Sequence, residues 1–119
     1  MIYSFDYVAK RKPLVIIGGP PCTSFSKLAH LNRSLNPEAY ERSRRHGVAL
    51  ARIMAKLFMI QIDSGRFCVV ENPKDSELWL LAIFLAIWAS GMVGEITFPQ
   101  CSLGLISPEG ELLLKWTIV

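Results

Sequence analysis

Cysteine is scarce in this chain, and the spacing of its cysteines excludes the sites that depend on paired thiols. The 119 residues include only three: Cys22, Cys68 and Cys101. Their number is odd and no two form a CxxC pair, so neither a disulfide framework nor a zinc site is indicated. Unpaired thiols suit a reducing, intracellular compartment, and we expect a cytoplasmic or nuclear protein.

Charge and long apolar runs are limited as well. Charged residues make up 19% of the chain and hydrophobic residues 51%, which favours one ordered domain, or part of one, over residues 1–119. No long apolar stretch follows the basic residues near the N-terminus, so a secretory signal is not indicated. The only membrane candidate is the uncharged run 78–94, which is at the short end of a bilayer span. We expect a buried core helix there, with a small membrane protein as the alternative.

The apolar pattern predicts strands that alternate with helices. Residues 14–17 and 66–70 are short apolar runs closed by Gly, Pro or polar residues, as is typical of buried strands. Apolar residues recur at helical spacing between them: Val48, Ile53, Leu57 and Ile60. The predicted order is a strand at 14–17, a loop at 22–37, a helix at 38–64, a strand at 66–70, a helix at 77–89 capped by Asp75 or Ser76, a strand at 92–98 and a weaker strand at 112–119.

This order predicts an α/β fold, with parallel strands and helices on the faces of the sheet. Ligands bind outside the carboxyl ends of such strands. Cys22 follows the first strand and Glu71 follows the second, so we expect both along one edge. A cysteine held by prolines at a strand end is placed as a nucleophile, and a neighbouring glutamate can act as its acid or hydrogen-bonding partner.

The other cysteines and the histidines do not share this pattern. Cys68 and Cys101 are expected to be small apolar residues of the interior, where free cysteine is commonly found. His30 and His46 have no partner pattern in the sequence. We expect a loop residue and a helix-surface residue, respectively, rather than catalytic bases.

Two motifs resemble those of one family. Residues 18–26, Gly-Gly-Pro-Pro-Cys-Thr-Ser-Phe-Ser, resemble the catalytic loop of the DNA cytosine-5 methyltransferases, in which Pro-Cys follows an apolar strand. Residues 71–73, Glu-Asn-Pro, resemble that family's second motif, usually Glu-Asn-Val, in the family's order and with one helix between the motifs. Pro73 in place of Val, and Thr23 after the cysteine, look more like the family's phage and retroelement relatives.

The resemblance implies a mechanism and part of a Rossmann-like, S-adenosylmethionine-dependent methyltransferase sheet. Cys22 as a thiolate would add to ring carbon 6 of a flipped-out cytosine, and Glu71 would bond ring nitrogen 3. Pro21 and Asn72 would fix the loop, and the methyl group would come from S-adenosylmethionine. The residues implied to hold the DNA are Ser24, Ser26, Lys27, Arg33, Arg44 and Arg45.

The resemblance covers only part of the family's catalytic domain. The family's glycine-rich turn for the donor has no match here, and neither does its ribose-binding acidic residue. Asp6 stands where the family has an acidic residue that contacts adenine, and Gly19 and Pro20 are the other residues implied to lie near the donor. The family's Gln-x-Arg-x-Arg segment is reduced to Gln100 without arginines. A second chain would then supply the donor-binding half.

Other interpretations stay open. The chain is a fragment of a longer or split enzyme, a decayed copy, or a small protein that uses the same loop for another purpose. An alternative from another class is a nucleic-acid-binding module without catalysis, built on the basic helix 38–56, because clustered cations attract a polyanion even at low net charge. The cations of this part of the chain are Lys27, Arg33, Arg42, Arg44, Arg45, Arg52 and Lys56.

Overall fold

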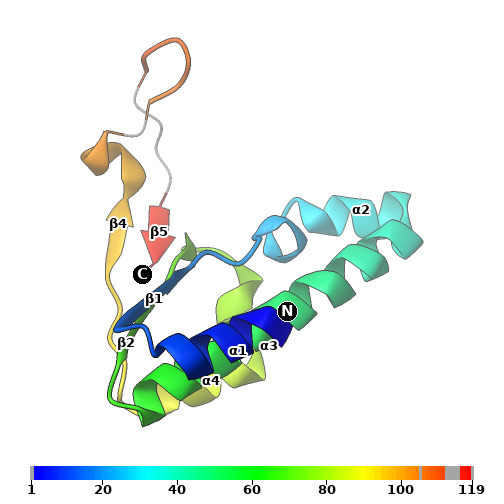
Figure 1. The fold of residues 1–119 in the computed structure, drawn as a ribbon. Helices are drawn as coiled ribbons and strands as arrows, with labels where there is room; N and C mark the ends of the chain where they lie inside the picture. The colour runs from blue at the N-terminus through cyan, green and yellow to red at the C-terminus, as the bar shows by residue number, and fades with distance from the viewer. Residues whose placement is uncertain (1, 105, 112–115, 119) are drawn as a thin grey trace.

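The computed structural model of this chain describes residues 2–104, 106–111 and 116–118, which form a mixed α/β structure (Figure 1). Short 3₁₀ helices are labelled η. In chain order the elements are α1 (Ile2–Arg11), β1 (Val15–Gly18), η1 (Thr23–Phe25), α2 (Ala29–Leu35), α3 (Pro37–Asp63), β2 (Phe67–Val70), β3 (Asn72–Pro73), η2 (Glu77–Leu80), α4 (Ala82–Ala89), β4 (Thr97–Pro99), η3 (Gln100–Leu103) and β5 (Trp116–Ile118).

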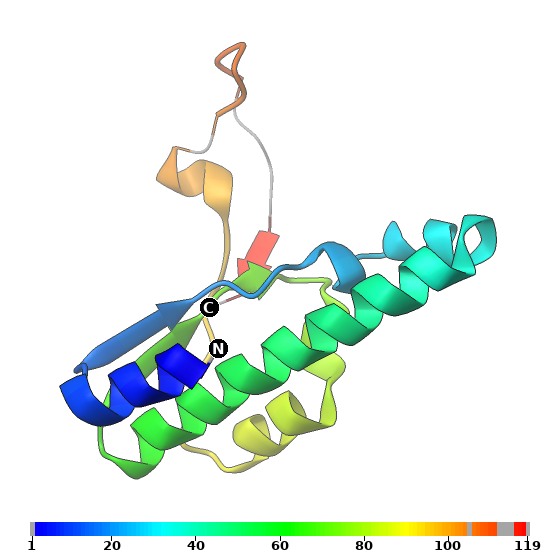
Figure 2. The ribbon, with the colours of Figure 1, turned by 45° about the vertical axis from the view of Figure 1, so that its right-hand side comes forward.

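Helix α3 is the scaffold of the structure, and it confirms the helix predicted for residues 38–64. The Asn36 side chain accepts a hydrogen bond from the Ala39 amide at 3.1 Å, and Pro37 occupies the first turn. The helix ends before Gly65, whose φ of 66° suits glycine. Figure 2 shows α3 running beneath β1 and η1 along most of the molecule.

The core forms where α3 meets the strands and α4. Ala51 and Ala55 are fully buried on α3, and their small side chains allow neighbouring elements to approach closely. The larger buried side chains come from several elements that are far apart in the sequence. They are Phe25, Val70, Leu78, Phe84 and Ile87.

Strands β1 and β2 form a parallel pair, as predicted, in the register Val15↔Phe67 to Gly18↔Val70. The face that carries Gly18 packs on α3, because a Cβ added to Gly18 would lie 2.3 Å from the Met54 sulfur. The opposite face exposes its apolar side chains. Ile17 is 77% exposed and Phe67 is 62% exposed. One face of this small sheet is therefore covered by a helix, and the other presents apolar residues at the surface.

The third predicted strand, residues 92–98, was wrong in extent and in direction. Only Thr97–Pro99 form β4, which pairs antiparallel with β5, and β5 also pairs antiparallel with β3. No helix of crossover length separates β4 from β5 in the residues that are described, and a chain that returns without such a crossover pairs antiparallel. Of the fourth predicted strand, Trp116–Ile118 form β5, and residues 112–115 and 119 lie outside the described residues.

The loop predicted for residues 22–37 was also wrong. This segment contains η1 and the helix α2, which packs on the first part of α3. The apolar side chains of α2 are largely exposed, and Leu35 is 81% exposed. The helix is therefore stabilised by its contact with α3 and not by an amphipathic repeat that the sequence could reveal. The helix α1 was not predicted either.

The helix predicted for residues 77–89 is broken into two pieces. Leu81 is extended, with φ −64° and ψ 136°, and separates η2 from α4. The predicted cap is correct at Ser76, whose hydroxyl accepts from the Leu78 amide at 3.3 Å. Within the described residues, no helix combines the length and apolarity needed to cross a bilayer.

The close approach of η1 to α3 at Gly47 gives the first testable prediction. A Cβ at Gly47 would lie 2.0 Å from the buried Ser24 hydroxyl oxygen, so Gly47→Ala must rotate the Ser24 side chain or displace η1. We expect a loss of about 2 kcal/mol in the free energy of unfolding, measured with urea. Gly94→Ala is the control, because nothing lies within 4 Å of its added Cβ, and it should change stability by less than about 0.5 kcal/mol. Equal effects of the two variants would contradict the close contact.

Candidate functional site

The two motifs lie side by side at the carboxyl ends of β1 and β2. The Glu71 amide donates to the Gly18 carbonyl at 2.9 Å, which continues the parallel pairing one residue beyond β2. The Asn72 side chain donates through Nδ2 to the Pro20 carbonyl at 2.8 Å. These bonds join the Gly-Gly-Pro-Pro-Cys loop directly to the Glu-Asn-Pro turn, so the two clusters share one edge, as predicted.

Cys22 stands at the start of η1 with an available thiol. The residue is half-buried, and its carbonyl accepts from the Phe25 amide at 2.9 Å. Its sulfur has no hydrogen-bond partner among the residues that the structure describes. Pro21, the preceding residue, is exposed. The prolines and the turn of η1 therefore hold a thiol at the edge without engaging it.

Cys68 shows the opposite environment. It lies on the face of β2 that packs against α3, with its sulfur 3.8 Å from the Phe58 carbonyl. Burial raises the pKa of the Cys68 thiol to about 11, because the charged thiolate is disfavoured away from water. The thiol therefore stays protonated at neutral pH, as expected for an interior cysteine. Cys101, in η3, is half-buried.

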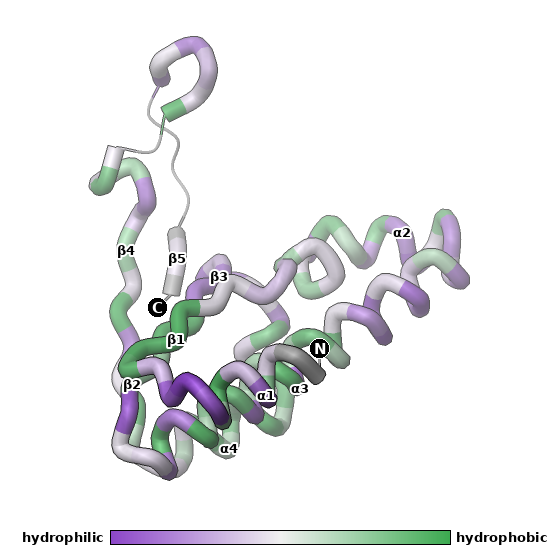
Figure 3. Tube along the Cα trace, in the orientation of Figure 1, coloured by the Kyte–Doolittle hydropathy of each residue, from purple (hydrophilic) through white to green (hydrophobic). Residues whose placement is uncertain are grey.

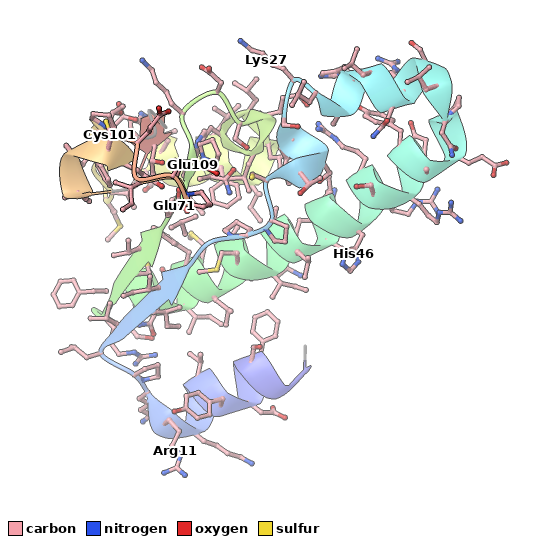
Figure 4. The ribbon with its side chains drawn as sticks, turned by 90° about the horizontal axis from the view of Figure 1, so that it is seen from above. Arg11, Lys27, His46, Glu71, Cys101 and Glu109 are labelled. Atoms are coloured by element: carbon pink, nitrogen blue, oxygen red, sulfur yellow. The ribbon has the colours of Figure 1, made fainter. Side chains whose placement is uncertain are left out.

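The Glu71 carboxylate is half-buried and has two neighbours. A Cβ added to Gly19 would lie 3.6 Å from one of its oxygens, so the carboxylate stands over this glycine. The other oxygen accepts from Gln100 Nε2 at 3.4 Å, and the same amide donates to Thr117 Oγ1 at 2.8 Å. Figure 4 labels Glu71 on the side of the molecule where η3, with Cys101, also lies. The Gln100 contact was missed, although Gln100 belongs to the reduced Gln-x-Arg-x-Arg segment.

Asn72 is an unusual buried group at this edge. The residue is 1% exposed, and its Nδ2 is used by the Pro20 carbonyl. Its Oδ1 is buried and has no donor in the described part of the protein. An unpaired buried acceptor is destabilising by about 1–3 kcal/mol, and such groups are often retained at functional sites. Asn72 therefore fixes the cysteine loop and also keeps an unused acceptor there.

Arg44 holds the loop from the other side. Its Nη1 donates to the Ser24 carbonyl at 3.1 Å and to Glu77 Oε2 at 2.6 Å, and its guanidinium lies 5.0 Å from the centroid of the Phe25 ring. Ser24 and Phe25 are buried. Two residues predicted to bind nucleic acid, Ser24 and Arg44, are therefore engaged inside the protein.

Glu77 also binds His30 of α2, with Oε1 2.6 Å from the imidazole Nε2. His30 is exposed but lies on α2 and not in the expected loop, and its partner was not foreseen, since the two are 47 positions apart in the sequence. The hydrogen bond from His30 lowers the pKa of the Glu77 carboxyl, and Arg44 lowers it further. The carboxylate is therefore favoured in the folded state.

The other predicted DNA-binding residues lie further out. Ser26 is half-buried, donates to the Thr23 carbonyl at 3.1 Å and accepts from the Ala29 amide at 3.3 Å, so it stabilises the entry to α2. Lys27, Arg33 and Arg45 are exposed. Figure 1 shows α2 and the first part of α3 extending away from the strands, and Figure 3 shows that hydrophilic residues are frequent there.

The residues implied to bind the methyl donor do not come together. Asp6 is exposed on α1, and Figure 4 shows α1, marked by Arg11, well away from Glu71. Gly19 faces the Glu71 carboxylate, and the Pro20 carbonyl is used by Asn72. These residues do not fit S-adenosylmethionine as one site.

A groove of about 440 Å³ lies away from this edge, between the end of α3, β2 and α4. Aromatic and aliphatic side chains dominate its lining, and Cys68 contributes to it. Cys22 and Glu71 do not line it. Its main apolar side chains are Phe58, Phe67, Trp79, Phe84, Trp88 and Val93.

The lowered pKa of Glu77 predicts a pH-dependent contribution to stability. Because the folded-state pKa lies below the ordinary 4.5, the carboxylate stabilises the fold above about pH 4.5 and stops doing so as the pH falls through the folded value. Glu77→Gln should therefore lose about 1 kcal/mol at pH 7 and progressively less below pH 4.5. Urea unfolding from pH 3 to pH 7 measures this, with the exposed Glu41→Gln as control. A difference that stays constant with pH would contradict the pairing.

No family model, no curated protein and no solved structure matches this chain. A functional assignment must therefore come from the two motifs and from their geometry. The strongest element of that geometry is the edge where a free thiol and a carboxylate follow adjacent parallel strands. Cys22 and Glu71 are the candidate functional residues.

Proposed function

We propose that this chain carries the cytosine-activating part of a DNA cytosine-5 methyltransferase-like domain. The observation that carries the proposal is the pair of loops at one edge, with the Cys22 thiol unengaged and Glu71 on the adjoining loop, bonded together through Asn72 and Pro20. On this proposal β1 and β2 are two neighbouring strands of a Rossmann-like methyltransferase sheet, and α3 is the helix that connects them.

The proposed chemistry is a reversible addition to the base. The Cys22 thiolate forms a bond to ring carbon 6, and the electrons of the 5,6 double bond move toward carbon 5 and ring nitrogen 3. Glu71 bonds nitrogen 3 through a shared proton and stabilises the charge that develops there. Carbon 5 is then nucleophilic. When carbon 5 has taken an electrophile, loss of its original proton and of the sulfur restores the aromatic ring.

Gln100 and Asn72 support the two reacting groups. Gln100 donates to one Glu71 oxygen and is itself held by the buried Thr117, which restricts the carboxylate. Asn72 donates to the Pro20 carbonyl and the Glu71 amide donates to the Gly18 carbonyl, so the loop before Cys22 is held at two points. A preorganised pair of this kind is what stabilisation of a developing charge requires.

The described residues do not provide a binding site for the methyl donor. Asp6, Gly19 and Pro20 do not form a donor site, so we propose only activation of the base for this chain, with S-adenosylmethionine held by a second chain. A base within a duplex cannot reach Cys22, so the target must be flipped out. Lys27 and Arg33, exposed beyond the cysteine loop, are suited to hold the flanking phosphates.

Exchange of the hydrogen on cytosine carbon 5 tests the activation step without a donor. Addition at carbon 6 makes carbon 5 basic, so DNA carrying tritium at this carbon should release it into water. We expect release with the unchanged protein, none above background with Cys22→Ser, and about a hundredfold slower release with Glu71→Gln. The readout is soluble tritium over time.

Cys101→Ser is the matched control, since it removes a half-buried thiol that lies outside the cysteine loop. It should leave the release rate unchanged. Equal release from the unchanged protein and from Cys22→Ser, with both folded by circular dichroism, would refute the proposal. A covalent complex with 5-fluorocytosine DNA that also requires S-adenosylmethionine would show that the donor binds after all.

A second candidate is a nucleic-acid-binding module without catalysis. Arg52 and Lys56 are one helical turn apart on α3, both exposed, and neither forms an ion pair within the described residues. Arg45, also exposed and unpaired there, lies two turns before Arg52 and extends this basic stripe. A stripe of this kind matches the phosphates of a nucleic-acid backbone.

Salt dependence tests this candidate. Binding to a labelled DNA duplex, followed by fluorescence anisotropy at several salt concentrations, should survive Cys22→Ala. The double variant Arg52→Gln/Lys56→Gln should reduce the slope of log affinity against log salt by about two, one for each lost phosphate contact. Glu38→Gln, which removes an exposed anion at the start of α3, is the control and should not reduce the slope. An unchanged slope in the double variant would exclude the basic stripe as the nucleic-acid-binding surface.

A further inference from the structure

We infer that Arg44, Glu77 and His30 are positioning residues that hold the nucleophile-bearing segment, residues 22–35, against the segment that carries Glu71. This inference rests on the proposed function for its meaning in catalysis. The geometry behind it is independent of that function. It comes from three side chains on α3, η2 and α2.

Glu77 is the centre of this cluster because each of its oxygens binds a different element. Oε1 lies 2.6 Å from His30 on α2, and Oε2 accepts from Arg44 on α3 at 2.6 Å. Glu77 itself follows Glu71 by six residues along the chain. The cluster therefore connects the Glu71 side of the site with the helix that follows Cys22.

Arg44 extends the connection to the residues next to Cys22. The nitrogen that binds Glu77 also donates to the Ser24 carbonyl at 3.1 Å, and the guanidinium lies over the buried Phe25 ring at 5.0 Å. A planar guanidinium can serve a carboxylate, a carbonyl and a ring together, whereas a lysine ammonium has no plane to stack on the ring. Arg44 therefore fixes η1, and Cys22 immediately precedes η1.

The partial burial of the pair gives these contacts energetic weight. The side chains of Arg44 and Glu77 are 27% and 28% exposed, so water screens them less than a fully exposed ion pair. The His30 ring is more open, at 43%, and lies 6.2 Å from the Tyr40 ring of α3. The contact to α2 is therefore the outer part of the cluster, and the contact to η1 is the inner part.

The test measures the position of the segment and the reactivity of Cys22 directly. In a Cys68→Ala/Cys101→Ser background, the rate of alkylation by a neutral reagent reports on Cys22 alone. Amide hydrogen exchange, read by mass spectrometry, reports on residues 23–35. We expect Glu77→Gln to raise the exchange rate of these amides about tenfold, which corresponds to roughly 1.4 kcal/mol, and to change the alkylation rate. Exchange in β2 and α4 should rise less, by no more than the roughly fivefold that a loss of about 1 kcal/mol in global stability allows.

Three further variants sharpen the result. Arg44→Lys should give an intermediate effect, because it keeps the charge and loses the planar group that lies over the Phe25 ring. His30→Asn should accelerate exchange in α2 and leave η1 protected. Arg45→Gln, next to Arg44 but exposed and unpaired in the described structure, should match the unchanged protein. If Arg44→Lys does not fold, the exchange rates of Glu77→Gln and His30→Asn still test the inference.

The outcomes separate this inference from the proposed function. Unchanged exchange in residues 23–35 and unchanged Cys22 alkylation in Glu77→Gln would overturn the inference, whether or not tritium is released from cytosine. Where the unchanged protein does release tritium, Glu77→Gln should slow release about tenfold at saturating DNA and leave the half-saturating DNA concentration unaltered. A change in that concentration alone would assign Glu77 to DNA binding and overturn the positioning role. Absence of tritium release in the unchanged protein would instead refute the proposed function.

Discussion

The close packing of α3 against β1, β2 and η1 is the contact on which the rest of this structure depends. It requires small residues on both sides. Ala51 and Ala55 on α3 are fully buried, Gly47 leaves room for Ser24, and Gly18 on β1 leaves room for Met54. Larger residues at these positions would force the facing side chains to rearrange or η1 and the strands to move, and a movement of η1 would carry the loop of Cys22 with it.

The candidate site is a consequence of this packing and of the parallel register. Because Gly18 pairs with Val70, the two strands end at the same level, and the chain segments that follow them meet. The Glu71 amide and the Asn72 side chain then bond to the opposite loop. A thiol and a carboxylate from distant parts of the sequence are thus brought to one edge by backbone geometry, before any interaction between their own side chains.

One face of this small sheet is not covered by other elements within the described residues. Val15, Ile17 and Phe67 expose apolar side chains on the face opposite α3, and the groove beside α4 is lined by aromatic residues. Contiguous apolar surface of this kind is more typical of an interface than of solvent-facing protein. Such a face is suited to being covered by another element or by another chain.

The sequence by itself determined the elements whose signal is local and periodic: the long helix α3, the strands β1 and β2, a cap at Asp75 or Ser76 and, through strand order, the shared edge of Cys22 and Glu71. Tertiary structure alone decided the helix α2, the break at Leu81 and the antiparallel pairing of β4 with β5, because each depends on contacts rather than on a local pattern. It also turned Arg44 inward and joined His30 to Glu77 across 47 residues. The sequence shows that a residue is charged, but it does not show whether the charge faces solvent or a carboxylate of another element. The partner is determined only when the chain has folded.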